Sequence, residues 1–186
     1  MNYLGVKCAS MSRMALPKDY AGEGCSLARA LEVVGERWTL LIVRDAFFGV
    51  RRFGDFAAHL AIPRAVLTQR LSALVEADVL AIVPGPHGHD EYALTGKGLD
   101  LWPVVRSLLT WGDDYYSANG PRRLFRHALD NGELAQDGTC AACGGVPPVT
   151  DQVVAPGPGW APRPGKADLV SAALARPHRL LTSVRG

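Results

Sequence analysis

The sequence predicts a mainly α-helical domain that carries one small β-hairpin. Four short helical patterns follow one another between residues 25 and 76. Two short β-branched runs come next, and one long helical pattern then ends near Tyr116. The chain has 186 residues, of which 48% are hydrophobic and 20% charged, so one domain with its own core, plus extensions, is expected.

The first two helices are expected in CSLARALEVVG and ERWTLLIVRDAFFG. Ser26 is placed to cap the first helix, and Gly35 is placed to end it. The second helix is apolar around most of its circumference, which predicts a central position in the core. Its Thr39 and Asp45, like Asp55 further on, are interpreted as surface or capping groups. The apolar stripe of the first helix consists of Leu27, Ala30, Leu31 and Val34.

The third and fourth helices are expected in RRFGDFAAHL and in the segment 62–80, IPRAVLTQRLSALVEADVL. Pro63 occupies a helix-start position, where its missing N–H costs nothing. Leu67, Leu71 and Leu74 are spaced i, i+4 and i+7 and form one apolar stripe. The other side of this helix lacks charge pairing and indicates contact with another molecule. This polar face consists of Arg64, Ala65, Thr68, Gln69 and Ser72.

A β-hairpin and a long last helix follow. VLAIV and EYALT, joined by the polar loop PGPHGHD, predict the hairpin. The last helix is expected to open near Thr95 and to be kinked at Pro103. It carries two apolar faces, and one domain core can absorb only one of them. The other face has the 3-4-3-4 spacing of a helix seam and predicts a homodimer contact, although a helix buried within a single chain is the alternative. This contact would consist of Leu101, Val104, Leu108, Trp111 and Tyr115.

The order of these elements is that of a winged helix-turn-helix, in which two short helices joined by a tight turn precede a hairpin wing. The fourth helix would enter the major groove of double-stranded DNA, where Arg64 and Gln69 can bond base edges bidentately. The net charge of +2 does not by itself imply a nucleic-acid partner, but six arginines between residues 37 and 70 form a basic cluster. The further expected DNA contacts are Arg51, Arg52, His87 and His89.

The cysteines and the absence of targeting signals bear on the cellular setting. Four cysteines at irregular spacing do not suggest a secreted disulfide framework, and the sequence shows neither an apolar run of membrane-spanning length nor a signal peptide. A cytoplasmic protein with no membrane contact is therefore expected. Cys25 lies just before the first helix, and the helix dipole together with Arg29 would favour its thiolate. Cys25 is thus a candidate oxidant sensor, and the alternative is a small buried side chain.

Cys140 and Cys143 form half of a zinc site, which needs two further ligands. His127 with Asp130 or Asp137 are weak candidates, so the sequence favours no metal site and no cofactor. A thiol oxidoreductase would need its first cysteine at a helix start, and the GGVPP that follows Cys143 argues against one. The sequence shows no Ser-His-Asp elbow, phosphate loop or plausible pair of catalytic carboxylates, so no enzyme is expected.

Several of these segments resemble the HxlR-type family of winged helix-turn-helix regulators. The resemblance covers about residues 25–116 and rests on three segments in the family's order: CSLARALEVVGERWTLLIVRDAFFGVRRFGDF, IPRAVLTQRLSALVEADVL and EYALTGKGLDLWPVV. It implies a cytoplasmic bacterial transcription regulator that binds DNA as a homodimer through terminal helices. By this resemblance Arg64, Thr68 and Gln69 lie on the recognition helix, PHGHDEY is the wing, and Cys25 matches a redox-sensing position of some members. The segment after residue 122 resembles an extension that carries Cys-x-x-Cys-Gly in part of the family.

The chain is therefore expected to have four parts. Residues 1–24 form a loose arm, 25–118 the DNA-binding domain, 119–154 an extension with Cys-x-x-Cys, and 155–186 a Pro/Gly-rich basic tail without fixed structure. The function expected is a sequence-specific repressor on an inverted-repeat operator, with a small-molecule or oxidant effector. A winged helix that has lost DNA binding and serves as a protein-interaction module is the alternative.

Overall fold

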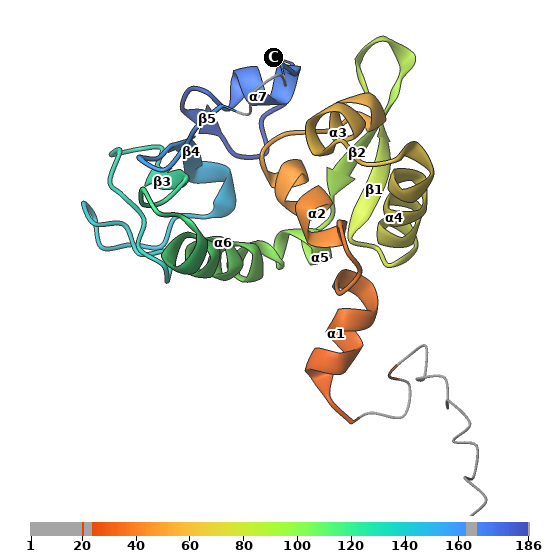
Figure 1. Cartoon of the computed structure of the whole chain (residues 1–186), viewed down its shortest axis with the longest axis horizontal. Helices are drawn as coiled ribbons and strands as arrows, with labels where there is room; N and C mark the ends of the chain where they lie inside the picture. The colour runs from red at the N-terminus through yellow and green to blue at the C-terminus, as the bar shows by residue number, and fades with distance from the viewer. Residues whose placement is uncertain (1–19, 21–23, 163–166, 186) are drawn as a thin grey trace, which may run out of the picture.

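The computed structural model describes residues 20, 24–162 and 167–185, and its elements follow the predicted order through the hairpin (Figure 1). The expected arm, residues 1–24, lies almost entirely outside the described residues. Among the helices that are described, none is both long and apolar enough to cross a bilayer.

The first half of the fold consists of α1 (Ser26–Val34), α2 (Thr39–Phe47), α3 (Phe53–Leu60), α4 (Arg64–Glu76), β1 (Leu80–Pro84) and β2 (Asp90–Leu94). The second half consists of α5 (Gly96–Leu99), α6 (Trp102–Tyr116), β3 (Arg123–His127), β4 (Gln152–Pro156), α7 (Leu169–Ala173) and β5 (His178–Arg179).

The core forms around α2, as its apolar circumference predicts. Ile42, Val43 and Phe47 are fully buried, and the three leucines of the α4 stripe pack into the same core. Two expectations about polar residues are wrong. Cys25, not Ser26, occupies the N-cap position of α1. Three polar residues interpreted as surface or capping groups are buried: Thr39, Asp45 and Asp55.

The wing is the expected antiparallel hairpin. Strands β1 and β2 pair from Leu80 with Leu94 at the base to Pro84 with Asp90 at the tip. A short 3-10 turn over Pro86–Gly88 connects them, and the backbone N–H of Gly85 donates to the carbonyl of His89 (2.8 Å). The N–H of Tyr92 donates to the carbonyl of Arg51 (2.8 Å), so the segment before α3 lies along the wing.

The last helix of the winged domain is two helices, not one helix with a kink. Thr95 caps α5 by accepting a hydrogen bond from the N–H of Gly98 (3.1 Å). α5 ends at Leu99 and α6 begins at Trp102; the two residues between them keep right-handed helical angles, but the N–H of Leu101 donates to the carbonyl of Gly98, an i→i−3 bond. Pro103 therefore lies in the first turn of α6, where its missing N–H removes no helical hydrogen bond.

A second small sheet forms after residue 122 and packs against α6 (Figure 1). Its strand order is β3-β4-β5, and both pairings are antiparallel. The indole N–H of Trp102 donates to the side-chain oxygen of Gln152 on β4 (2.9 Å), and both residues are buried. The guanidinium of Arg106 lies 4.3 Å from the centre of the Phe125 ring and donates to the carbonyl of Ala135 (2.7 Å). Together these contacts fix the extension on one face of α6.

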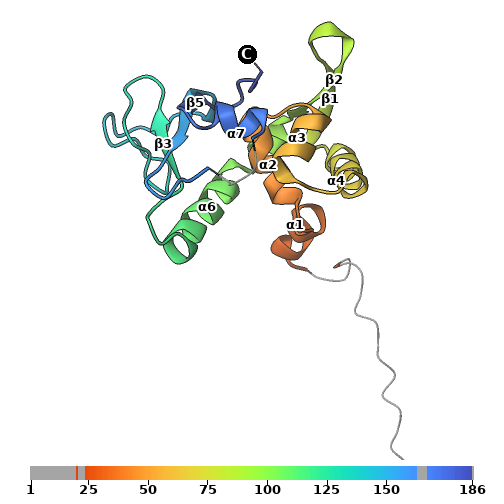
Figure 2. The ribbon, with the colours of Figure 1, turned by 45° about the horizontal axis from the view of Figure 1, so that its top comes forward.

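The expectation of an unstructured tail at 155–186 is wrong for its described part. Val170, Leu174 and Leu180 are each 1% exposed and belong to the core. α7 lies beside α3, and the chain beyond it crosses the end of α2, as both views show (Figures 1 and 2). The backbone N–H of Leu181 donates to the carbonyl of Phe47 (2.8 Å). The Pro/Gly-rich residues 155–162 thus follow one packed segment, β4, and α7 further along the chain is packed as well.

Candidate nucleic-acid interface

The polar face of α4 is the surface that the sequence singled out. Its five residues, Arg64, Ala65, Thr68, Gln69 and Ser72, are all exposed, while the leucine stripe on the opposite side is buried. α4 and the wing tip lie on the same side of the molecule, away from α6 and the second sheet (Figures 1 and 2). The structure therefore brings the predicted reading residues together on one accessible helix face.

Two of these five side chains have contacts within the chain. The guanidinium of Arg64 lies 4.9 Å from the centre of the Phe53 ring, a cation–π contact that orients it along the α3–α4 junction. The hydroxyl of Thr68 donates to the carbonyl of Arg64 (3.0 Å) within the helix. Gln69 and Ser72 form no hydrogen bond with the described part of the chain, so their polar groups are available to a ligand.

The two arginines expected to contact phosphates are engaged with the wing. The side chain of Arg52 lies 3.3 Å and that of Arg51 3.8 Å from the carboxylate of Glu91. Glu91 is buried, and Arg51 also donates to the carbonyl of Leu181 (2.8 Å). Both arginines keep part of their surface exposed, so a phosphate contact would add to these bonds. Arg51 thereby links the wing to the C-terminal segment, whereas Arg52 contacts the wing alone.

At the wing tip, His89 is exposed, whereas the side chain of His87 lies outside what the structure describes. Ile82 on β1 is 54% exposed. The wing offers no arginine, as its sequence shows, so its contribution to a backbone contact would be steric and polar rather than strongly cationic.

The second predicted surface is the seam on α6. Its residues are Val104 (45% exposed), Leu108 (48%), Trp111 (52%) and Tyr115 (70%), with Leu101 half-buried. The other apolar face of the helix carries Trp102 and Val105, both buried in the chain's own core. α1 also presents leucines to solvent, Leu27 at 66% and Leu31 at 40%. The chain thus leaves two apolar helix faces unburied, which is unusual for a protein that functions alone.

Cys25 occupies the N-cap of α1 and is exposed, so its alternative interpretation as a buried side chain is wrong. Arg29 was expected to add positive charge nearby. Its guanidinium instead forms an ion pair with Glu32 (2.7 Å), which offsets that charge. Of the features expected for a sensor, Cys25 keeps an accessible thiol at the start of a helix.

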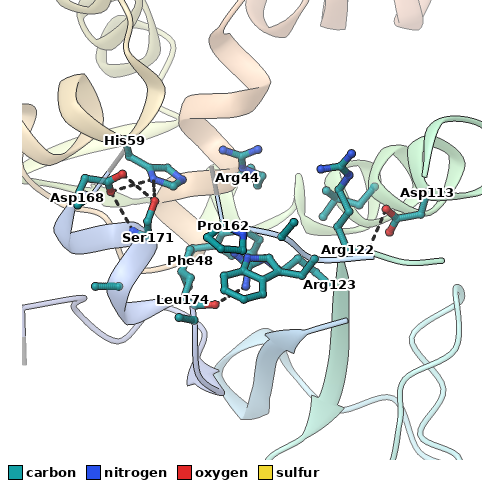
Figure 3. Close-up of a pocket in the computed structure, with 16 residues that line it drawn as sticks. Arg44, Phe48, His59, Asp113, Arg122, Arg123, Pro162, Asp168, Ser171 and Leu174 are labelled. Carbon is teal, nitrogen blue, oxygen red and sulfur yellow. Dashed lines mark hydrogen bonds and ion pairs between the residues drawn. The ribbon is translucent and has the colours of Figure 1, made fainter. Parts of the chain in front are cut away.

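A cavity of about 500 Å³, which no sequence pattern predicted, lies between the winged domain and the C-terminal segment (Figure 3). Phe48 and Trp160 contribute aromatic surface, Arg44, Arg122 and Arg123 contribute positive charge, and Asp113 and Asp168 contribute negative charge. Burial, together with the nearby Arg44, lowers the pKa of Arg123 to about 10. Arg123 donates to the carbonyl of Leu174, and within the described part of the chain no carboxylate forms an ion pair with it.

One wall of this cavity carries a histidine, a serine and an aspartate (Figure 3). The Nδ1 of His59 lies 3.1 Å from Asp168 and 3.4 Å from the Ser171 hydroxyl, which itself donates to Asp168 (2.7 Å). A catalytic triad needs its serine on one imidazole nitrogen and its aspartate on the other. Here both approach the same nitrogen, so the arrangement caps α7 through Asp168 and does not activate Ser171 as a nucleophile.

Comparison with known proteins agrees with this architecture. The model of the HxlR-like helix-turn-helix family matches residues 33–120. An HTH-type transcriptional regulator of Mycobacterium tuberculosis, Rv3095, is 45% identical over 142 residues, which cover 74% of this chain and 89% of the relative. The chain belongs to the HxlR-like helix-turn-helix family. This regulator family's winged helix-turn-helix is therefore the fold that carries α4 and the wing.

Two further proteins show how far the similarity extends. YvaP, an HTH-type transcriptional regulator of Bacillus subtilis, is 30% identical over 90 residues, covering 47% of this chain and 83% of the relative. The crystal structure of PA1607, a candidate transcription factor, is 34% identical with a TM-score of 0.51, covering 80% of this chain and 96% of the other. Because only 32 residues precede the family match at residue 33, that 80% must include residues beyond 120. At least part of the chain beyond residue 120 is thus shared with this relative.

Proposed function

We propose that this HxlR-type regulator binds an inverted-repeat DNA operator as a homodimer in the bacterial cytoplasm and represses transcription there. The observation that carries the proposal is the exposed polar face of α4, set on a buried leucine stripe and flanked by the wing. A major groove admits one α-helix, and Gln69 and Arg64 have the donor and acceptor geometry to read base edges. No catalytic arrangement competes for this surface among the described residues.

The dimer would form through the α6 seam, with α1 of each chain covering part of its partner. Aromatic and aliphatic anchors such as Trp111 and Leu108 are typical of interface cores. A two-fold dimer carries two copies of α4, and such dimers bind half-sites about one helical turn, roughly 34 Å, apart. The operator is therefore expected to be an inverted repeat.

The effector, in our proposal, is a small aromatic anion bound in the cavity of Figure 3. Three arginines, two aspartates and two aromatic side chains line that cavity, and Arg123 has no ion pair within the described residues, which favours an anion. A bound ligand would contact both α7 and the end of α2. Benzoate and indole-3-acetate are suitable probes, with benzamide as the uncharged control. The two carboxylates should raise Tm of the wild type and of the control Arg176→Ala, but not of Arg122→Ala. Equal responses to benzoate and benzamide contradict it.

The test of DNA binding is a gel shift with the DNA upstream of the protein's own gene, repeated over a salt titration. Specific binding should survive competition by random DNA. It should also weaken as the salt concentration rises, because each arginine that binds a phosphate displaces a counterion from the DNA. Binding that random DNA competes away equally well, or no binding at low salt, would favour the alternative of a protein-interaction module.

A further inference from the structure

A cluster of four side chains in the C-terminal extension has the composition and spacing of a metal site. His127, Asp130, Cys140 and Cys143 each offer one ligand atom, and these atoms all lie within 4.8 Å of one another. The Nδ1 of His127 lies 3.1 Å from Asp130 and 3.6 Å from the Cys143 sulfur. The Cys140 sulfur lies 3.3 Å from the carboxylate of Asp130. Asp137, the other acidic candidate in the sequence, is not part of the group.

These distances match the edges of a tetrahedron around zinc. Zn–S bonds of about 2.3 Å and Zn–N or Zn–O bonds of about 2.0–2.1 Å place neighbouring ligand atoms roughly 3.3–3.8 Å apart. Three of the six distances between ligand atoms, 3.1, 3.3 and 3.6 Å, are close to this range, and the other three are at most 4.8 Å. Two thiolates with an imidazole and a carboxylate favour Zn²⁺ over Mg²⁺ or Ca²⁺, which prefer oxygen ligands alone.

Backbone hydrogen bonds hold the four ligands in place. His127 ends β3, and its N–H donates to the carbonyl of Gly132 (2.8 Å), which folds the chain back beside it. Cys140 and Cys143 belong to a knuckle closed by the Gly144 N–H on the Cys140 carbonyl (2.9 Å) and the Cys140 N–H on the Gly145 carbonyl (2.8 Å). The ligand atoms therefore converge because of the fold and not through flexible side chains alone.

Two details of the cluster are specific to its geometry. The N–H of Gly132 donates to Asp130 (2.8 Å) and fixes the direction of its carboxylate. A side chain at Gly132 would place its Cβ 2.4 Å from the Cys140 sulfur, so only glycine leaves room for the sulfur at this position. These contacts orient a carboxylate and a thiol toward a common point.

The extension also lacks enough apolar core to fix this segment by itself. From residue 128 to 146 only Leu134 and Cys140 are buried, and Leu129 and Val146 are 86% and 67% exposed. Small segments with little core are commonly stabilised by a structural metal, whose binding energy becomes folding energy. The sequence favoured no metal site because it identified only two clear ligands, Cys140 and Cys143. The approach of His127 and Asp130 to these cysteines is a property of the fold.

We propose that His127, Asp130, Cys140 and Cys143 bind one structural zinc ion, which closes the extension against β3. All four positions are protein ligands, so the site has no open position for catalysis. A disulfide between Cys140 and Cys143 is the competing state of these thiols, and it would leave His127 and Asp130 without a ligand role.

The test is the metal content of the full chain purified under reducing conditions, measured by mass spectrometry. About one zinc per chain is expected. The variants Cys140→Ser, Cys143→Ser and Asp130→Asn should lose most of it, whereas the matched controls Cys25→Ser and Asp137→Asn should keep it. His127→Cys should retain zinc, because cysteine is an equally good ligand, while His127→Ala should not.

A second measurement covers variants that fail to fold. Reduced, metal-free wild-type protein is titrated with Co²⁺, whose visible spectrum reports tetrahedral thiolate coordination, and Tm is recorded with and without a chelator. The expected result is a cobalt–thiolate spectrum at one equivalent and a chelator-dependent drop in Tm that Asp137→Asn shares. Wild type that contains no zinc, takes up no cobalt after reduction and melts identically with chelator overturns the proposal. Equal zinc in wild type and Cys143→Ser overturns it as well.

Discussion

Individual polar residues inside the core could not be interpreted correctly from the sequence. Asp45 is fully buried in α2, where it pairs with Arg44 (2.5 Å) and lies 4.0 Å from His59. His59 in turn contacts Asp168, which is 109 positions further along the chain. A helical pattern shows which face a residue occupies, but it does not show contacts with distant segments, such as the one between His59 and Asp168. The same holds for Asp55, which Arg185 binds bidentately at 2.7 and 2.8 Å.

His59 should make stability depend on pH in the mildly acidic range. Burial lowers its pKa below the ordinary value of about 6.5, against the opposing effect of Asp45. Below that value the unfolded chain binds more protons than the folded one, so stability should fall as pH drops from about 7 toward 5. Burial of Asp168 tends to raise the pKa of its carboxyl, but hydrogen bonds from Ser171 outweigh this and lower that pKa. The contribution of Asp168 to stability is therefore lost only at lower pH than that of His59.

The measurement is urea unfolding of wild type, His59→Gln and the control His89→Gln, between pH 7 and 5. His59→Gln should flatten the profile in this range, while His89→Gln, on the exposed wing, should reproduce the wild-type slope. Identical slopes in all three proteins would show that another group controls the acid sensitivity.

At the scale of elements, local patterns predicted most of the winged domain. The leucine stripe of α4 and the paired strands of the wing follow from spacing within a few residues, and both are confirmed. The break before α6 was missed because a proline can either kink a helix or begin one, and the local sequence around Pro103 fits both. The two faces of α6 were recognised correctly, with one buried in the chain and one exposed. What covers the exposed face stays a prediction.

Leu108→Glu should release monomers. Leu108 is 48% exposed in the single chain, so the charge costs little there, but in the proposed seam it would be buried without a partner. The control is Leu129→Glu, since Leu129 is 86% exposed on the extension. Light scattering at micromolar concentration should give a dimer for wild type and Leu129→Glu, and a folded monomer for Leu108→Glu. A wild type that is already monomeric would remove the proposed seam.

Across the whole molecule, the C-terminal segment is an integral part of the winged domain. Its Pro/Gly-rich beginning suggested a linker, and the basic residues after it suggested a solvated tail. A signal was present, however, at α7 and its C-cap residue, where Val170 and Leu174 are spaced as one helical face. That short stripe has no local partner, so its burial against α3 follows only from the long-range contacts of the fold.

Gly49 is the position at which this docking is most sensitive. It has a positive φ of 86°, and an added Cβ would lie 1.7 Å from the carbonyl oxygen of Thr182. Gly49→Ala should therefore cost more than the roughly 1–2 kcal/mol of a left-handed backbone alone, because the tail must move. Gly54→Ala is the control, since nothing lies within 4 Å of the added atom. Equal stability of the two variants in urea unfolding would show that residues 178–184 do not dock at α2.

The central claim is that the polar face of α4 reads DNA sequence, and in vitro selection from random duplexes tests it most directly. Wild type, Gln69→Ala and the control Gln136→Ala, an exposed glutamine on the extension, are each used to enrich binding sites. Wild type and Gln136→Ala should select the same inverted repeat. Gln69→Ala should lose preference at one symmetric pair of positions, with a cost on the order of 1–3 kcal/mol for the wild-type site. An identical motif from all three proteins would contradict the claim, as would the absence of any motif from wild type.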